Sequence, residues 1–102
     1  MERTTKTKPK RFGFRHVVKR RGRKEKYDER KIYASVYESC HAAGLTTKQA
    51  EKISAKVSDT ITKWAEKKDA MHAHEIHREV INALRKMDKD TAFMYEMHKN
   101  IC

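Results

Sequence analysis

The chain has 102 residues, which suits one small domain, and it is 37% hydrophobic and 38% charged, so it supports only a modest core. No apolar run approaches the roughly 18 residues of a membrane-spanning helix, and no apolar stretch follows the basic N-terminus as in a secretory signal. The two cysteines form no CxxC pair, which excludes a zinc ribbon and argues against a disulfide framework. We therefore expect a cytoplasmic protein with no membrane partner.

The formal net charge of +11 is concentrated at one end of the chain. Residues 1–31 contain 14 Lys and Arg against 4 Asp and Glu, a net +10, whereas residues 32–102 contain 11 against 10, a net +1. Residues 1–11 have no apolar side chain other than Met1, so they have nothing to bury. We expect a disordered basic arm over residues 1–12, one domain over residues 13–102, and an anionic partner for the basic end.

A basic hairpin is predicted directly after the arm. Residues 15–20 and 23–27 predict two short strands, joined by a turn at Arg21-Gly22, because glycine accepts the positive φ that a tight hairpin turn requires. Asp28 follows as the N-cap of a helix. The cations around Gly22 suit a polyphosphate, and the residues alone leave open whether this is a free nucleotide or a nucleic-acid backbone.

Two helices with clear apolar stripes come next. The first is predicted over residues 29–43 and ends at Gly44, which can take the left-handed conformation of a C-cap. The second extends to residue 67, and it is opened by a capping box in which Thr46 and Gln49 satisfy each other's backbone N–H groups. The expected core positions at three- and four-residue steps are Ile32, Val36, Cys40, Ala50, Ile53, Val57, Ile61 and Trp64.

Two further helices complete the predicted fold. The third runs over residues 74–86, and Asp88 or Asp90 caps a fourth. The expected core positions in this part are Ile76, Val80, Ala83, Leu84, Met87, Ala92, Met94, Met97 and Ile101. The predicted fold class is α+β and mostly helical, with an N-terminal β-hairpin packed on a four-helix bundle.

Several segments, in chain order, resemble the ATP-cone domain over roughly residues 16–99. They are the hairpin Val17-Val18-Lys19-Arg20-Arg21-Gly22, the helix opening Tyr27-Asp28-x-x-Lys31-Ile32, the helix end Ala43-Gly44-Leu45, and Glu75-Ile76-x-x-x-Val80 in the third helix. ATP-cones are nucleotide-binding regulatory domains of ribonucleotide reductases and of the zinc-ribbon repressors of reductase genes. Since neither a reductase body nor a zinc ribbon is attached, the resemblance implies a stand-alone regulatory module for ATP or dATP.

The resemblance also implies roles for individual residues. Lys19 and Arg20, after Val18, match the family's phosphate ligands, and Glu25 and Asp28 match the acidic groups that read adenine. Lys31 and Ile32 match a pair that lies over the nucleotide. The family usually has a threonine just before the third helix, where this chain has Met71-His72-Ala73-His74, so His72 or His74 is expected in its place. His77 and Lys99 complete the predicted nucleotide site, and Mg²⁺ is the expected companion of the phosphates.

The alternative function is nucleic-acid binding by the same fold, without a nucleotide-dependent role. Its predicted contacts are Lys8, Lys10, Arg11, Arg15, Arg21, Arg23 and Lys24. No metal site is predicted, although His74 and His77 lie three residues apart on one helix. Since the chain contains no P-loop or nucleophile elbow, no enzymatic activity is expected. The partners considered are adenine nucleotide, DNA, a reductase or another enzyme, and a second copy of the chain through the last helix.

Overall fold

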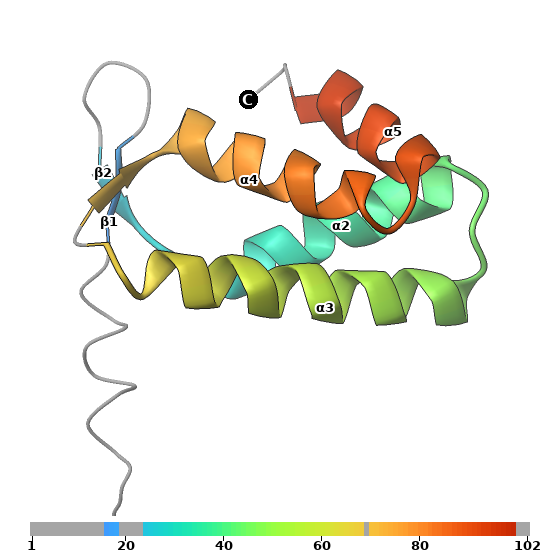
Figure 1. Cartoon of the computed structure of the whole chain (residues 1–102), viewed down its shortest axis with the longest axis horizontal. Helices are drawn as coiled ribbons and strands as arrows, with labels where there is room; N and C mark the ends of the chain where they lie inside the picture. The colour runs from blue at the N-terminus through green and yellow to red at the C-terminus, as the bar shows by residue number, and fades with distance from the viewer. Residues whose placement is uncertain (1–15, 19–23, 69, 100–102) are drawn as a thin grey trace, which may run out of the picture.

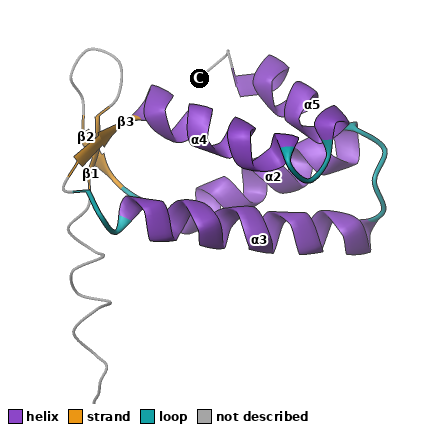
Figure 2. Ribbon diagram, viewed as in Figure 1, coloured by secondary structure: helices purple, strands orange, loops and turns teal. Residues whose placement is uncertain are grey.

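The computed structural model describes residues 16–18, 24–68 and 70–99 (Figure 1). Within them lie four helices, namely α2 (Glu29–Ala42), α3 (Thr47–Ala65), α4 (Ala73–Arg85) and α5 (Lys89–Lys99). Each helix runs back along the one before it, and the strands gather at one end of the bundle (Figure 2). The mostly helical fold and the four predicted helices are therefore confirmed. No described helix is both long and apolar enough to cross a membrane.

Three short strands form one sheet, in the order β2-β1-β3. The central strand β1 (His16–Val18) pairs antiparallel with β2 (Lys24–Lys26) and parallel with β3 (Ala70–His72). The turn that the sequence predicts at Arg21-Gly22 lies outside the described residues. The third strand was not predicted. This strand pairs the segment before α4 with β1. Met71 at its centre is only 1% exposed.

The helix ends follow the predicted chemistry. Asp28 caps α2 by accepting the backbone N–H of Arg30. Gly44 has a φ of 91°, which a glycine adopts without steric cost. Thr46 and Gln49 form both halves of the capping box that opens α3. The side chains of Asp28, Thr46 and Gln49 satisfy backbone groups that helix ends leave without partners. Gly44 and the capping box fix where α2 ends and α3 begins.

The core lies where the four helices meet. The stripe of α2, the inner face of α3 and the middle of α4 meet there, as the sequence predicted for most of these positions. Tyr27 and Ile81 also join this core, and neither was predicted there, whereas Ile53 and Trp64 are only partly buried at its edge. The residues of the core that are at most 1% exposed are Val36, Cys40, Ala50, Val57, Ile61, Ala65, Met71, Val80 and Leu84.

The prediction for the last helix was wrong in its inner face. Met97 is 52% exposed, and Met87, before α5, is 37% exposed. Ala92 is buried as predicted, and Thr91 and Tyr95, which were not predicted there, are buried with it. These three lie at i, i+1 and i+4, which share a face of a helix, whereas Met97 lies on another side. Thr91 is tolerated in the core because its hydroxyl donates to Asp88 Oδ2 at 2.6 Å.

Candidate functional site

Three chain segments that are distant in sequence meet at one end of the sheet. The register pairs Val18, the last residue of β1, with Lys24, the first of β2, and with His72, the last of β3. His72 is also the N-cap of α4. The end of β1, the start of β2 and the N-terminus of α4 therefore lie side by side, and an N-terminal helix end carries partial positive charge.

The start of α2 presents an ionised carboxylate. Asp28 Oδ1 accepts from the backbone N–H of Arg30 at 3.0 Å and from its Nε at 3.2 Å, and Oδ2 accepts from Arg30 Nη2 at 3.3 Å. The hydrogen bond from the Arg30 guanidinium is the main cause that holds the pKa of Asp28 below its usual value. Asp28 is therefore a hydrogen-bond acceptor at neutral pH. Arg30, its partner, was not predicted to contribute to the site.

Tyr27 fixes the junction between β2 and α2. Its ring is 7% exposed, and its hydroxyl lies 3.0 Å from Thr62 Oγ1 on α3. Burial of the phenol is the main cause that raises the pKa of Tyr27 to about 12. The residue before Asp28 is thus anchored to the long helix, which holds the acidic end of α2 in place relative to the bundle.

The start of α4 carries two exposed histidines. The rings of His72 and His74 stack at a centroid distance of 5.3 Å, and Glu75 Oε1 accepts the backbone N–H of His72 at 2.9 Å. This hydrogen bond lowers the pKa of Glu75, and the charge of the nearby Lys68 adds to the effect. Lys68 Nζ also lies 5.1 Å from the ring centroid of Trp64. The two imidazoles therefore lie at the sheet end on His72's side, whereas Lys68 precedes the other end of β3.

Asp28 and Arg30 follow Lys26, which pairs with His16, so the start of α2 lies at the opposite end of the strands from Val18 and His72. Other predicted site residues lie elsewhere in the bundle. His77 stacks on Tyr95 of α5 at a centroid distance of 5.3 Å, so it belongs to the contact between α4 and α5. Ile32 is 7% exposed and lies in the core, whereas Lys31 one residue earlier is exposed. Lys99 ends α5, and its side chain is outside the description.

The remaining predicted residues are strand positions or lie outside the described residues. Val18, Lys24 and Glu25 are strand positions. Glu25 is the register partner of Val17, which pairs on its other side with Met71. The other predicted phosphate and nucleic-acid contacts lie outside the described residues. They are Lys8, Lys10, Arg11, Arg15, Lys19, Arg20, Arg21 and Arg23.

Metal and thiol chemistry find no site in the described part of the chain. It holds no group of three or more His, Cys, Asp or Glu side chains that could bind a metal ion. The ring of His74 stacks on His72 and that of His77 stacks on Tyr95, so the two histidines have different neighbours. Cys40 is fully buried, and this burial raises the pKa of its thiol, which makes it unreactive.

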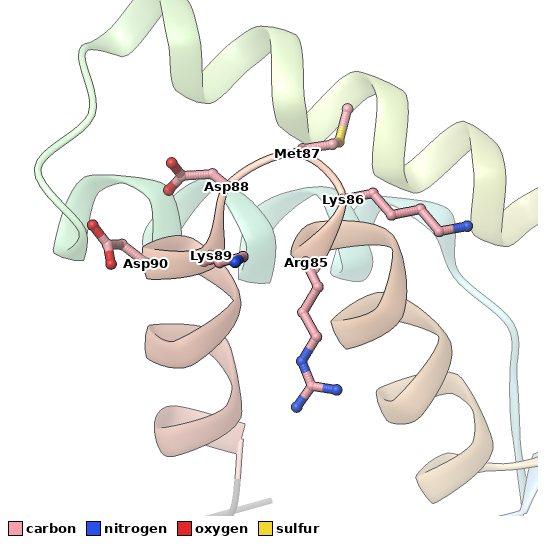
Figure 3. A pocket seen from close by; sticks show the side chains of 6 residues that line it. All are labelled: Arg85, Lys86, Met87, Asp88, Lys89 and Asp90. Atoms are coloured by element: carbon pink, nitrogen blue, oxygen red, sulfur yellow. The ribbon is translucent and has the colours of Figure 1, made fainter.

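A shallow hollow lies far from the sheet. It has a volume of about 400 Å³ and is lined by residues 85–90, at the turn between α4 and α5 (Figure 3). Asp88 contributes to this turn and accepts the backbone N–H of Thr91 at 3.0 Å. The turn is at the opposite end of α4 from the strands (Figure 1). The hollow is therefore a consequence of how two helices are joined, and we assign no ligand to it.

Comparison with known proteins identifies the family. A family model described as "ATP cone domain" matches residues 15–100, which includes every described element. A search of curated proteins gives no match.

Proposed function

The chain belongs to the ATP-cone family, whose domains bind adenine nucleotides, and we propose that this chain is a regulatory module that binds ATP or dATP at the end of the sheet. One observation carries the location. The parallel pairing of β1 with β3 aligns Val18 with His72, so the strand that leads into Lys19 and Arg20 ends beside the N-terminus of α4. A helix N-terminus and nearby cations together favour a phosphate group.

The acidic start of α2, at the His16 end of the strands, suits the base of a nucleotide whose phosphates lie at the Val18 end. A carboxylate has about four lone-pair sites, and Arg30 occupies two on Oδ1 of Asp28 and one on Oδ2. One acceptor site on Oδ2 is left for the exocyclic amine of adenine. Guanine presents a carbonyl oxygen in place of that amine, which Asp28 would repel. We propose that Asp28 reads the base, together with Glu25, while Lys31 lies over the nucleotide.

Calorimetric titration with ATP and dATP tests the site. A Lys19→Ala/Arg20→Ala variant should bind at least tenfold more weakly, because each lost charge-assisted hydrogen bond is worth about 1.5–3 kcal/mol. A Lys86→Ala/Lys89→Ala variant removes the same charge from the distal turn, where both side chains are exposed, and it should bind as the wild type does. Absence of binding by the wild type, or equal weakening in both variants, would refute the site.

We propose that the bound nucleotide is sensed and not consumed, and that Mg²⁺ accompanies its phosphates. Phosphate release above the uncatalysed rate would contradict the first statement. Titration with and without EDTA tests the second, since a magnesium-bridged complex should weaken when the ion is removed.

The proposed output is transcriptional regulation or allosteric control of an enzyme such as a reductase, by way of self-association. Phe93 is 60% exposed and Met97 is 52% exposed, and they lie one turn apart on α5. Burial of such side chains between two copies of the chain is favourable. A ligand shifts this equilibrium only if it binds one state more tightly. Light scattering with and without ATP should therefore show a change in mass. The substitution Phe93→Ser should make this change smaller.

Nucleic-acid binding is the second candidate function, favoured by the net +10 of residues 1–31. The predicted contacts in the arm would pair with backbone phosphates, so deletion of residues 1–11 should weaken binding to a duplex and flatten its salt dependence. Unchanged affinity after the deletion would count against the arm.

A further inference from the structure

The long helix α3 carries a row of lysines on its outer side. Lys48, Lys52, Lys56 and Lys63 are all exposed. At about 100° per residue, the four positions fall within an arc of roughly 80° around the helix axis. The row extends about 22 Å along that axis at 1.5 Å per residue. In Figure 1, α3 is the lowest helix, and no other labelled element lies below it.

Most of this charge is not neutralised within the fold. Lys63 Nζ pairs with Asp59 Oδ2 at 3.2 Å. For Lys48, Lys52 and Lys56, the described residues provide no ion pair. The three are separated by one helical turn each, so three cations stand about 6 Å apart in a line. A rigid helix holds this spacing at no further cost in backbone entropy.

We propose that this lysine row, defined as Lys48, Lys52, Lys56 and Lys63, is a surface that binds the phosphate backbone of a nucleic-acid duplex. A strand of duplex DNA presents one negative charge per 3.4 Å of helix axis, so the roughly 12 Å between Lys48 and Lys56 faces about three phosphates of one strand. Lys63 lies beyond Asp59, which occupies the same arc of the helix and pairs with it. The inference does not depend on nucleotide binding. It also uses none of the residues 1–31 on which the second candidate function rests.

An anionic membrane fits the surface less well. Helices that lie on membranes combine a basic face with large apolar side chains that enter the lipid. Among the described residues, the exposed large apolar side chains are Met87, Phe93 and Met97. These belong to α5 and the turn before it, and α3 contributes none. The row therefore offers positive charge without apolar side chains that could enter a lipid layer. This combination suits a phosphate backbone.

Fluorescence anisotropy with a labelled DNA duplex, measured between about 50 and 200 mM salt, tests the proposal. The variant Lys48→Gln/Lys52→Gln/Lys56→Gln keeps good helix formers on α3. Each lost phosphate contact lowers the magnitude of the salt slope by about 0.9, so the slope should fall by two to three. The control Arg78→Gln/Lys86→Gln/Lys89→Gln removes the same charge from exposed positions on α4, α5 and their connection, and its slope should fall by less than one.

Three results of the anisotropy experiment would overturn the proposal. The wild-type chain does not bind the duplex, or the two triple variants lose affinity equally, or Lys8→Gln/Lys10→Gln/Arg11→Gln alone abolishes all binding. Vesicles of phosphatidylserine form a further arm of the test. If the α3 variant loses vesicle binding and keeps its duplex affinity, the surface is a lipid site and the proposal fails. Circular dichroism of each variant confirms that the helices are retained.

Discussion

The Tyr27 hydroxyl gives a sharp test of how the strand–helix junction is held. Tyr27→Phe removes its hydrogen bond to Thr62 and leaves the ring in the core. A net intramolecular hydrogen bond is worth about 1 kcal/mol. Since Thr62 is half-buried, its freed hydroxyl reaches water and adds little penalty. We expect the free energy of unfolding near pH 8 to fall by about 1 kcal/mol.

The same substitution should change the response to alkaline pH. The pKa of Tyr27 is about 12 in the folded chain against an ordinary value of 10.0, so its stabilising contribution is complete below pH 10 and disappears as the pH rises to about 12. The limit is about 1.4 kcal/mol per pH unit, and we expect roughly half of this because solvent screens a partly exposed hydroxyl. The wild type should therefore lose its advantage over Tyr27→Phe by about pH 12.

Urea denaturation followed by circular dichroism, at several pH values, measures both effects. Tyr33→Phe is the matched control, because the described residues give the half-buried Tyr33 hydroxyl no hydrogen-bond partner. It should change the unfolding free energy near pH 8 by much less than Tyr27→Phe does. If wild type and Tyr27→Phe lose stability in parallel between pH 10 and 12, the phenol is not the responsible group and the reasoning fails.

Three other substitutions have expected outcomes from the same physical arguments. Ser54 Oγ is buried and has no hydrogen-bond partner among the described residues, so Ser54→Ala should stabilise the chain by about 1 kcal/mol, seen as a melting temperature several degrees higher. A lower melting temperature would mean that the hydroxyl has a partner. Gly44→Ala meets no steric obstacle but strains a φ of 91°, and it should cost about 1 kcal/mol in urea denaturation. Asp28→Ala should cost about 1 kcal/mol by loss of the N-cap. Since the folded pKa of Asp28 is lowered, its contribution is present above the ordinary carboxyl pKa and disappears as the pH falls through the folded value. The wild type and Asp28→Ala should therefore converge in acid, and a constant difference would contradict the assignment.

The sequence predicted the helices well because their signals are local. Asp28, Gly44 and the Thr46–Gln49 box act within a few residues of themselves, and the apolar stripes of α2 and α3 repeat clearly. The last helix was harder. Its methionines had the right spacing for a core, but beside the predicted Ala92 the buried residues are Thr91 and Tyr95. A threonine can be buried there only because Asp88 accepts a hydrogen bond from its hydroxyl, which no hydrophobicity pattern shows.

The residue types of the candidate site stay a prediction, while its geometry was partly missed. The roles of the acidic and basic residues around β2 follow from the family resemblance. The strand Ala70–His72 was not predicted, because three residues without a β-branched side chain give no strand signal. Its pairing with β1 depends on residues more than 50 positions away. The role of Arg30 was also missed, since an exposed arginine near a helix start is ordinary until its contacts are known.

The parallel pairing of β1 with β3 closes a long loop of the chain at the sheet. Val17 and Met71 are register partners across 54 positions, and closing a loop of that length costs about 3.5 kcal/mol of chain entropy beyond a constant term. The helices between them can form and pack without this closure. A ligand that contacts both the end of β1 and the start of α4 stabilises the closed form alone, by mass action. Amide hydrogens of the sheet should therefore exchange more slowly when nucleotide is bound, while those in the middle of α3 exchange at rates set by the bundle itself.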